Sequence, residues 1–379
     1  MKTIGIITYH HYYNYGTMLQ ALALQKKVEQ LGYQAELIDY KQDNSLSRCE
    51  MLKLRMRRMP VYIKERKKYQ VLAESRGKIK DKNDLFENFY EEYLHVGKKK
   101  YTTTQQLIEN PPVYDGYVVG SDQTWNPYVA NSPEAFFLPF VENKSKKGSY
   151  GPSLAIRTLS DEKEKEYRKK LSSFAFLSCR EQDGAQLLSR ITQKEVKCVL
   201  DPTLLLSDKE WGKYCKYEIP KEPYILIYFL GEKLEHRKAV EKLHKITNWK
   251  IVSLPVSYLE MGNNECKKVW GGPSEFLSLI RGAALICTDS FHGTMFSINF
   301  QKNFFAFCKS SDSEEASENS RLYSALNIFG LSNRIIHNID NLTEKDISID
   351  YKSVIPILEE QRRSSIEYLE NMLCEITKG

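Results

Sequence analysis

The stretch Ala284-Leu285-Ile286-Cys287-Thr288-Asp289-Ser290-Phe291-His292-Gly293 decides the fold of this chain. Its apolar first half is typical of a buried strand, and the residues from Thr294 to Phe300 have helical character. In an open α/β sheet, ligands collect where strands end and helices begin, because the first helical turn has unpaired N–H groups and a partial positive charge. A carboxylate, a hydroxyl and an imidazole in this turn therefore indicate a reaction site. The alternative is an ordinary turn with an aspartate cap and a core histidine.

The same alternation of strand and helix extends over the chain in both directions. Strands are predicted at 3–9, 35–39, 113–119, 174–178, 196–200, 224–230, 250–254 and 284–288. Their order predicts parallel sheets with right-handed crossovers. Apolar residues at helical spacing from Ile355 to Ile376 predict a long closing helix. We therefore predict an α/β fold of two Rossmann-like domains facing across a cleft. The expected ranges are 1–205 with a helical insertion at about 46–94, then 222–350, then the closing helix at 351–379.

Length and composition set the broad class of protein. A chain of 379 residues suits two domains, and 41% apolar with 27% charged residues is the balance of a globular protein in water. No apolar run approaches the roughly 20 residues that span a bilayer, and the first residues lack the features of a secretory signal. A cytoplasmic location is therefore expected. The 8 cysteines contain no CxxC pair and are interpreted as packing residues without a disulfide frame or zinc site.

The stretch from Arg48 to Lys80 is rich in Lys and Arg, although the whole chain carries a net charge of only +6. Such a stretch usually forms the solvated face of a helix. The sharper hypothesis is a peripheral contact with anionic lipid at the inner face of the membrane, or with a pyrophosphate-linked lipid substrate. Nucleic acid is not an expected partner, because no recognised binding motif accompanies the charge.

Polar clusters follow three further strands. Asn14-Tyr15-Gly16 could bind a sugar or anion at a helix N-terminus, with Gly16 letting the ligand approach, or could be an ordinary cap. Ser121-Asp122-Gln123 with Trp125 suits a sugar, although the Trp could equally be core. Arg180 could bind an anion or pair with Glu181 or Asp183.

Two adjacent histidines, His10 and His11, precede the first of these clusters. In extended chain their side chains diverge, which argues against a shared metal. We therefore predict no metal site.

These motifs together resemble the polysaccharide pyruvyl transferase family. The resemblance rests on Asn14-Tyr15-Gly16 with Leu19-Gln20-Ala21, Gly120-Ser121-Asp122-Gln123 with Trp125-Asn126-Pro127, Arg180-Glu181, Asp201-Pro202-Thr203, and Asp289 to Gly293. It covers about residues 4–335 and implies a GT-B-like fold. It also implies transfer of the pyruvyl group of phosphoenolpyruvate onto two hydroxyls of a sugar in a surface polysaccharide, such as a capsule or exopolysaccharide, or in its lipid-linked precursor. Phosphoenolpyruvate is the donor substrate, and no cofactor is expected.

The resemblance also suggests roles for single residues. His292 is the expected catalytic acid or base, and Asp289 would orient it or act on the acceptor. Some branches of the family place a donor-binding arginine two residues before the histidine, where this chain has Ser290, so Arg281, Arg321 or Arg334 is expected to supply that cation. The residues expected to bind the donor are Arg180, Ser290, Gly293, Thr294, Arg281 and Arg321. Those expected to bind the acceptor are Asn14, Tyr15, Gly16, Ser121, Asp122, Gln123 and Trp125.

Two other functions fit the same scaffold. One is a glycosyltransferase with another activated donor, because function resides in the site and not in the fold. The other is a glycan-binding relative without catalysis.

Overall fold

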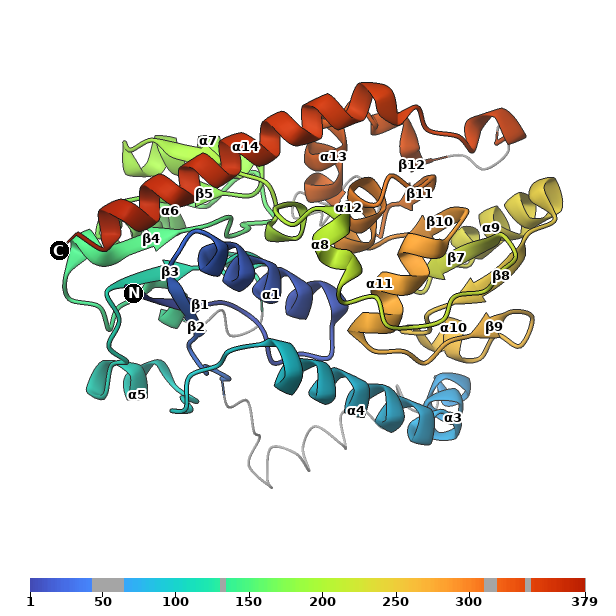
Figure 1. Cartoon of the computed structure of the whole chain (residues 1–379), viewed down its shortest axis with the longest axis horizontal. Helices are drawn as coiled ribbons and strands as arrows, with labels where there is room; N and C mark the ends of the chain where they lie inside the picture. Colours follow the sequence, from blue (N-terminus) through green and yellow to red (C-terminus); the bar gives the residue numbers. More distant parts are fainter. Residues whose placement is uncertain (43–64, 130–133, 310–318, 338–341, 379) are drawn as a thin grey trace.

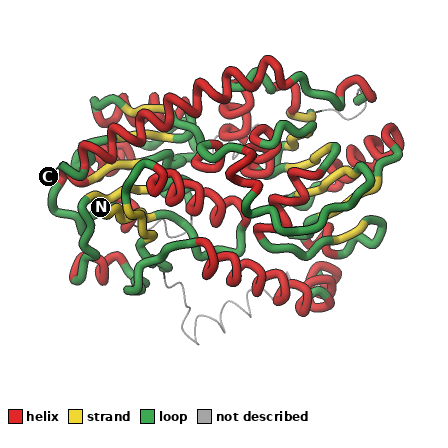
Figure 2. The backbone as a smooth tube through the Cα atoms, viewed as in Figure 1, coloured by secondary structure: helices red, strands yellow, loops and turns green. Residues whose placement is uncertain are grey.

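Two parallel β-sheets, one from each half of the chain, organise the computed structural model (Figure 1). The structure describes residues 1–42, 65–129, 134–309, 319–337 and 342–378. Helices cover the sheets, and the path of the chain alternates between strand and helix (Figure 2). This arrangement agrees with the predicted α/β class.

The first sheet has the strand order β2-β1-β3-β4, and every printed pairing in it is parallel. Its strands are β1 (Thr3–Ile7), β2 (Gln34–Leu37), β3 (Gly116–Val119) and β4 (Lys147–Ser149). A parallel bridge between Gly148 and Phe176 leads on to the pair β5 (Leu177–Cys179) and β6 (Val196–Cys198). The strand predicted at 113–119 begins only at Gly116, because Pro111-Pro112 precedes it and Val113 is exposed.

The second sheet has the order β12-β11-β10-β7-β8-β9, again with parallel pairings. Its strands are β7 (Tyr224–Tyr228), β8 (Lys250–Ser253), β9 (Lys267–Lys268), β10 (Leu285–Thr288), β11 (Phe304–Phe307) and β12 (Ile335–Ile336). Every residue of β7, β10 and β11 is buried, as expected for strands covered by helices on both faces.

The helices connect these strands and pack on them. Their bounds are α1 (Tyr15–Gln30), α3 (Arg66–Glu74), α4 (Arg76–Tyr93), α5 (Thr104–Glu109), α6 (Asp161–Leu171), α7 (Gln182–Thr192), α8 (Asp208–Gly212), α9 (Leu234–Thr247), α10 (Tyr258–Met261), α11 (Pro273–Gly282), α12 (Phe291–Asn299), α13 (Asn319–Ile328) and α14 (Tyr351–Ile376). Short 3₁₀ turns occur at η1 (Glu134–Phe137), η2 (Lys144–Lys146), η3 (Pro202–Leu204), η4 (Ser332–Arg334) and η5 (Glu344–Asp346).

Helix α1 of the first half packs against α11, α12 and η3, so the two halves share one interface. A single apolar cluster contains buried residues of both sheets, such as Ile6 of β1 and Leu226 of β7. Burial of apolar surface is the main favourable term in such contacts. The two sheets therefore hold a fixed relation through a shared core.

The predicted helical insertion contains α3 and α4, while residues 46–64 of it lie outside the described residues. The two helices lie along one side of the molecule and reach the second half, where α3 packs on α10 and α4 on α11 (Figure 1). Some cations of the basic stretch make contacts there: Lys68 lies 3.0 Å from Glu232, and Lys78 lies over the ring of Trp270. The insertion thus connects the halves.

The predicted closing helix is present as α14, which crosses from the second half back to the first (Figure 1). Near its end, Met372 and Ile376 pack closely against Gly148 of β4 and Gly116 of β3. Its middle is anchored by Ser365, whose hydroxyl accepts the N–H of Leu200 at 3.0 Å.

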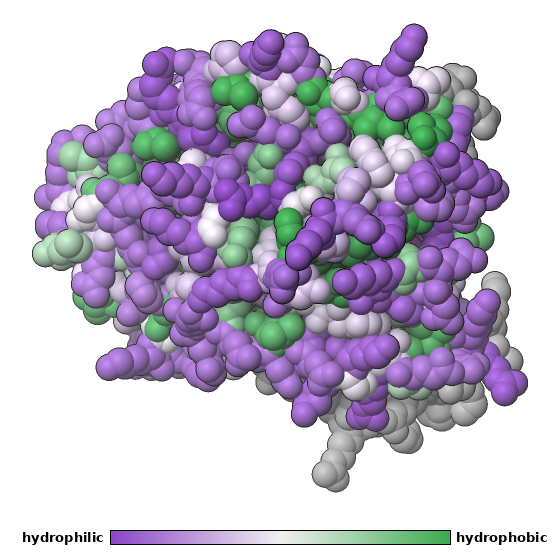
Figure 3. Space-filling view, turned by 45° about the vertical axis from the view of Figure 1, so that its right-hand side comes forward, coloured by the Kyte–Doolittle hydropathy of each residue, from purple (hydrophilic) through white to green (hydrophobic). Residues whose placement is uncertain are grey.

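In the part of the chain that the structure describes, no helix is both long enough and apolar enough to cross a bilayer. The face shown in Figure 3 is mostly hydrophilic, with apolar side chains in small scattered patches.

Candidate functional site

The strand order reverses once in each sheet, and the candidate site lies where the two reversal points meet. In the first sheet β1 lies between β2 and β3, and in the second β7 lies between β8 and β10. Ligands of open α/β sheets bind at such points, outside the carboxyl ends of the strands. The first turns of α1 and α12, which follow β1 and β10, face each other here. An ideal Cβ on Gly16 would lie only 2.0 Å from Nδ1 of His292.

His292 is buried in the first turn of α12, and its carboxylate partner is Asp201. Nε2 of His292 lies 3.5 Å from Oδ2 of Asp201, while the other oxygen of Asp201 accepts the N–H and hydroxyl of Thr203 at 3.0 and 2.7 Å. Burial alone would raise the pKa of Asp201, but His292, Arg180 and Thr203 hold it well below its ordinary range. Asp201 is therefore a fixed negative charge beside the imidazole.

Arg180 directly follows β5 and pairs with the same aspartate. Its Nη1 donates to Oδ2 of Asp201 at 2.6 Å, and its guanidinium lies 4.3 Å from the ring centre of Phe291. Burial lowers its pKa, but Asp201 and Glu181 outweigh burial and raise the pKa above the ordinary value. Within the described residues, its buried Nε and Nη2 have no hydrogen-bond partner. Nε lies 3.8 Å from Oε1 of Glu181, beyond hydrogen-bond distance. A buried guanidinium with two N–H groups that make no hydrogen bond suits a carboxylate or phosphate ligand.

The loop after β3 brings polar groups to the same place. Ser121 donates to Oδ2 of Asp201 at 3.4 Å, and Asp122 accepts the hydroxyl of Thr17 in α1 at 2.8 Å. Asp122 has a φ of 66°, a left-handed conformation that is uncommon outside glycine and occurs most often at Asn and Asp. The loop thus holds a sharp turn directly beside the first turn of α1.

Gln123 continues this loop and connects it with the second half. With its amide oxygen turned toward Arg321 of α13, Gln123 accepts from both Nη atoms at 3.3 Å. Arg321 was predicted to bind the donor. It comes from the second half of the chain, and this contact places it at the loop after β3.

Asp289 does not orient His292. Its two oxygens accept the backbone N–H groups of Leu230 and Gly231, both at 2.7 Å. It therefore ties the end of β10 to the end of β7, and Asp201 occupies the role beside the imidazole that we had expected for Asp289.

The polar groups in the first turn of α12 make hydrogen bonds with one another. The helix begins at Phe291, so His292 lies inside it, and the Ser290 hydroxyl caps it by accepting the N–H of Gly293 at 3.2 Å. Thr294 donates its N–H and its hydroxyl to the carbonyl of Ser290. Ser290, Gly293 and Thr294 therefore shape the turn, and their predicted contact with the donor is not supported by this geometry.

The acceptor residues predicted in α1 separate into different roles. Asn14 caps the helix by accepting the N–H of Thr17 at 3.2 Å. Tyr15 is buried, stacks on Phe276 at 4.5 Å and donates to the carbonyl of Gly271, so it joins the halves instead of binding a sugar. The space beside Gly16 belongs to His292 and not to a ligand.

Trp125 is a core residue. It has no exposed surface, its Nε1 donates to the carbonyl of Phe136 at 3.1 Å, and its ring stacks on Phe137. It therefore has no free face for a sugar ring.

Ser290 stands where some branches of the family have a donor-binding arginine, and three other arginines were proposed to replace it. Two of the three lie away from the candidate site. Arg281 is at the end of α11, next to the amino ends of the strands, where it pairs with Asp208 at 2.8 Å. Arg334 donates to the carbonyls of Phe304, Asp346 and Ile347. Neither lies with His292.

Asp201 is part of a motif that we recognised in the sequence, but we predicted no role for it in the site. A signal was present, because an Asp-Pro-Thr turn after a strand is a typical cap with a carboxylate fixed at the strand exit. The choice of His292 as its partner depends on how the halves pack, which local sequence does not reveal.

The side chains of His10 and His11 converge, so the prediction that they diverge is wrong. The backbone bends at residues 11–13 instead of staying extended, and the two rings lie 4.0 Å apart beside Asp39.

The architecture is that of the GT-B glycosyltransferases, as predicted. An α-glucosyltransferase solved with UDP and a 13-mer DNA matches with a TM-score of 0.50 at 10% identity, over 99% of this chain and 95% of that chain. UDP-GlcNAc 2-epimerase from Methanocaldococcus jannaschii matches with a TM-score of 0.49 at 12% identity, over 95% of this chain and 100% of that one. No curated protein matches the chain in sequence.

The amino-acid sequence shows which protein family the chain belongs to. The family model described as polysaccharide pyruvyl transferase matches residues 14–307, which include α1, Arg180, Asp201 and the first turn of α12. The chain belongs to the polysaccharide pyruvyl transferase family. Membership makes it a transferase.

Proposed function

We propose that this protein transfers the pyruvyl group of phosphoenolpyruvate onto two hydroxyls of a sugar in a surface polysaccharide or its lipid-linked precursor. The products are a pyruvate ketal and phosphate. The observation that carries the proposal is the buried Arg180, which lies beside the Asp201–His292 pair and whose Nε and Nη2 make no hydrogen bond within the described residues. An anion-binding group and a candidate proton carrier are thus fixed on one carboxylate, within a family of pyruvyl transferases.

The donor carries a carboxylate and a phosphate, so it needs more than one cation. Arg180 already faces two carboxylates, Asp201 at 2.6 Å and Glu181 at 3.8 Å. A second guanidinium is therefore required for charge balance, and Arg321 reaches the neighbouring loop through Gln123. Donor binding would then depend on both halves of the chain, because Arg180 and Arg321 come from different ones.

Two proton transfers accompany the reaction. The methylene carbon of the donor gains a proton, two sugar hydroxyls each lose one, and two C–O bonds form at the central carbon while its bond to the phosphate oxygen breaks. One hydroxyl proton ends on the new methyl group, and the other ends on the departing phosphate. His292 is the proposed carrier of these protons, because imidazole serves as both acid and base near neutral pH. Asp201 positions the ring.

The acceptor sugar would lie against the loops after β1 and β3. Asn14, Ser121, Asp122 and Gln123 offer amide, hydroxyl and carboxylate groups there, which are the groups that bind sugar hydroxyls. The reaction as written consumes only the donor and the acceptor, so the proposal includes no cofactor.

The test is incubation of the purified protein with phosphoenolpyruvate and a panel of acceptor glycans. Phosphate release together with a product that has gained one ketal-linked pyruvyl group, detected by mass spectrometry, is the expected result. Parallel reactions contain nucleotide sugars. If nucleoside diphosphate is released and the glycan is extended, the protein is a glycosyltransferase and the proposal is wrong. Glycan binding without turnover of any donor would indicate a binding protein.

Arg180→Lys tests the donor site, with Arg281→Lys as its matched control. Lysine keeps the charge but loses the planar fork, so kcat/KM for phosphoenolpyruvate should fall by about ten- to a hundred-fold, since a charged hydrogen bond contributes about 1.5–3 kcal/mol. Arg281 lies on the surface with Asp208, and its variant should keep the wild-type kcat/KM. Equal losses in both variants would remove Arg180 from donor binding.

A further inference from the structure

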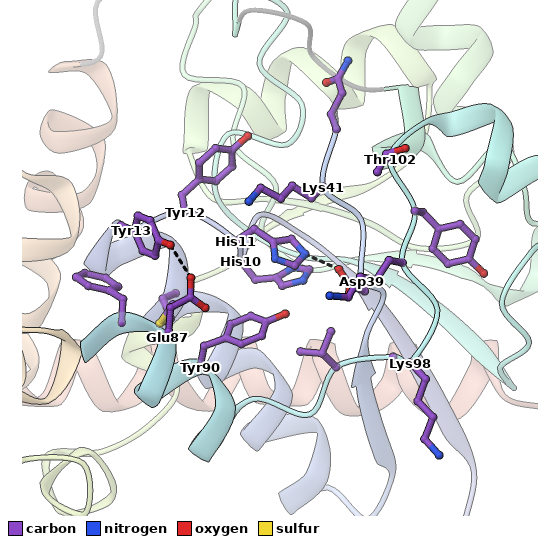
Figure 4. A pocket seen from close by; sticks show the side chains of 17 residues that line it. His10, His11, Tyr12, Tyr13, Asp39, Lys41, Glu87, Tyr90, Lys98 and Thr102 are labelled. Atoms are coloured by element: carbon purple, nitrogen blue, oxygen red, sulfur yellow. Dashed lines mark hydrogen bonds and ion pairs between the residues drawn. The ribbon is translucent and has the colours of Figure 1, made fainter. Parts of the chain in front are cut away.

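Three potential metal ligands converge at the carboxyl ends of β1 and β2, on the other side of β1 from the loop after β3. His10 and His11 follow β1, and Asp39 follows β2. One ligand atom from each of the three lies within 4.8 Å of the other two, among the described residues searched. Nε2 of His11 lies 2.8 Å from Oδ1 of Asp39, and both side chains point toward His10 (Figure 4).

His10 supplies the second, independent observation. Its side chain has no exposed surface, and Nδ1 lies 2.9 Å from the carbonyl of Thr8, an acceptor that requires the proton on Nδ1. Nε2 is then an unprotonated nitrogen in the interior, and no hydrogen-bond partner for it exists among the described residues. A histidine whose far nitrogen donates to a backbone carbonyl while the near nitrogen is free has the arrangement of a metal ligand.

We propose that His10, His11 and Asp39 bind one divalent transition-metal ion of the Zn²⁺ type. Imidazole nitrogens and a carboxylate oxygen are ligands that Zn²⁺ accepts in proteins. The ion would lie between Nε2 of His11 and Oδ1 of Asp39 and would use the free Nε2 of His10. Ligand bonds of about 2.0–2.2 Å around a tetrahedral ion place the ligand atoms about 3.3–3.6 Å from one another. His11 and Asp39, whose ligand atoms are 2.8 Å apart, would therefore separate slightly, within a cluster whose three ligand atoms all lie within 4.8 Å of one another.

The fourth position of the metal would open into a cavity of about 820 Å³. Lys41 and Tyr90, which are labelled in Figure 4, line this cavity together with Lys100. The two lysines weaken the attraction of the site for a bare cation. They also favour an anionic group of a ligand as the fourth metal ligand, because such a group would neutralise them.

The proposed site assumes nothing about the reaction at His292. The loop from His10 to Asn14 joins it to that reaction centre and leads into the first turn of α1. A bound ion would fix this loop at its start, while Asn14 fixes it at its end.

The experiment uses the full chain without a histidine tag. The protein is stripped with a chelator and incubated with Zn²⁺, excess metal is removed, and bound zinc is measured by mass spectrometry. Co²⁺ provides a visible absorption signature, and thermal unfolding is followed with and without Zn²⁺. We expect one equivalent of zinc, a raised Tm in the presence of Zn²⁺, and loss of both in His11→Ala and in Asp39→Asn.

His95→Ala is the matched control, because Nδ1 of His95 pairs with Glu29 at 2.7 Å outside the cluster. It should bind zinc as the wild type does. Circular dichroism establishes that each variant is folded, and two variants at partly and fully buried positions keep the test valid if one of them fails to fold. Zinc bound equally by wild type, His11→Ala and Asp39→Asn, or by none of them, would overturn the proposal whatever the assay with phosphoenolpyruvate shows.

Discussion

Tyr15 and Gly16 are consecutive residues in the first turn of α1, yet they meet the second half in opposite ways. Tyr15 fills space: its ring stacks on Phe276 and contacts Phe86 and Tyr228 edge-on or at a tilt. Gly16 leaves space, which the imidazole of His292 occupies. One turn of helix therefore holds the halves together with one residue and makes room for the candidate catalytic group with the next.

This difference separates stability from chemistry at a distance of one residue. Changes at Tyr15 should act mainly on the free energy of unfolding. Changes at His292 should act mainly on turnover. Changes at Gly16 should lower stability only while the imidazole of His292 fills the space beside it.

The largest effect is expected from His292→Ala. Loss of a general acid–base group lowers turnover by about two to four orders of magnitude. Turnover with phosphoenolpyruvate and acceptor is measured beside His95→Ala, an exposed histidine outside the site. Turnover of His292→Ala close to that of the control would remove His292 from the mechanism.

Tyr15→Ala should lower the free energy of unfolding by about 3–5 kcal/mol, the cost of truncating a buried aromatic ring. Tyr15→Phe keeps the ring and loses only the hydrogen bond to the carbonyl of Gly271, so its loss should be about 0.5–1.5 kcal/mol. Denaturant unfolding measures both. If the two variants lose the same stability, the ring does not hold the halves together.

Gly16→Ala places a methyl group where the His292 ring lies, and overpacking of this kind costs about 1–3 kcal/mol. Gly77→Ala in α4 is the control, because nothing lies within 4 Å of its ideal Cβ. The sharper test is the double variant Gly16→Ala with His292→Ala, in which the clash is absent. Adding Gly16→Ala to His292→Ala should cost little further stability, and a cost as large as in the wild-type background would show that the clash lies elsewhere.

The smallest effect is expected on the free energy of unfolding at low pH, through Asp201. The pKa of Asp201 is held below its ordinary value in the folded chain, so its contribution to stability is complete above about pH 4 and is lost as the pH falls below that value. Unfolding free energies of wild type and Asp201→Asn are compared between about pH 5 and pH 2. The decline should be shallower in the variant. Parallel declines would mean that Asp201 is not the carboxylate that titrates.

Much of the fold could be predicted from sequence, because its signals are local. The apolar run before Asp289, the βαβ opening and the periodic apolar residues of α14 each indicate their element by themselves. Boundaries were less certain: β3 starts later than predicted, and α12 starts before His292 and not after it. Turn residues blur such ends, because caps satisfy the terminal N–H groups in either register.

The site was only partly predictable, since its contacts are distant in sequence. His292, Arg180 and the loop Ser121-Asp122-Gln123 were identified from their positions after strands. That Asp201 and not Asp289 faces His292, and that Trp125 is core, follows from packing across elements. His10 and His11 converge because the backbone bends, and no pattern in the sequence indicates the direction of that bend.

Helix α14 has a consequence for how the chain is made. Its last turns pack on β3 and β4, so the first sheet receives a covering helix from the final residues of the described chain. Synthesis proceeds from the N-terminus at about 5–20 residues per second, and contacts between distant segments form late. Gly116 and Gly148 therefore lack their contacts with Ile376 and Met372 until α14 has been translated. A chaperone that shields this face during translation would shorten the period in which it is open to aggregation.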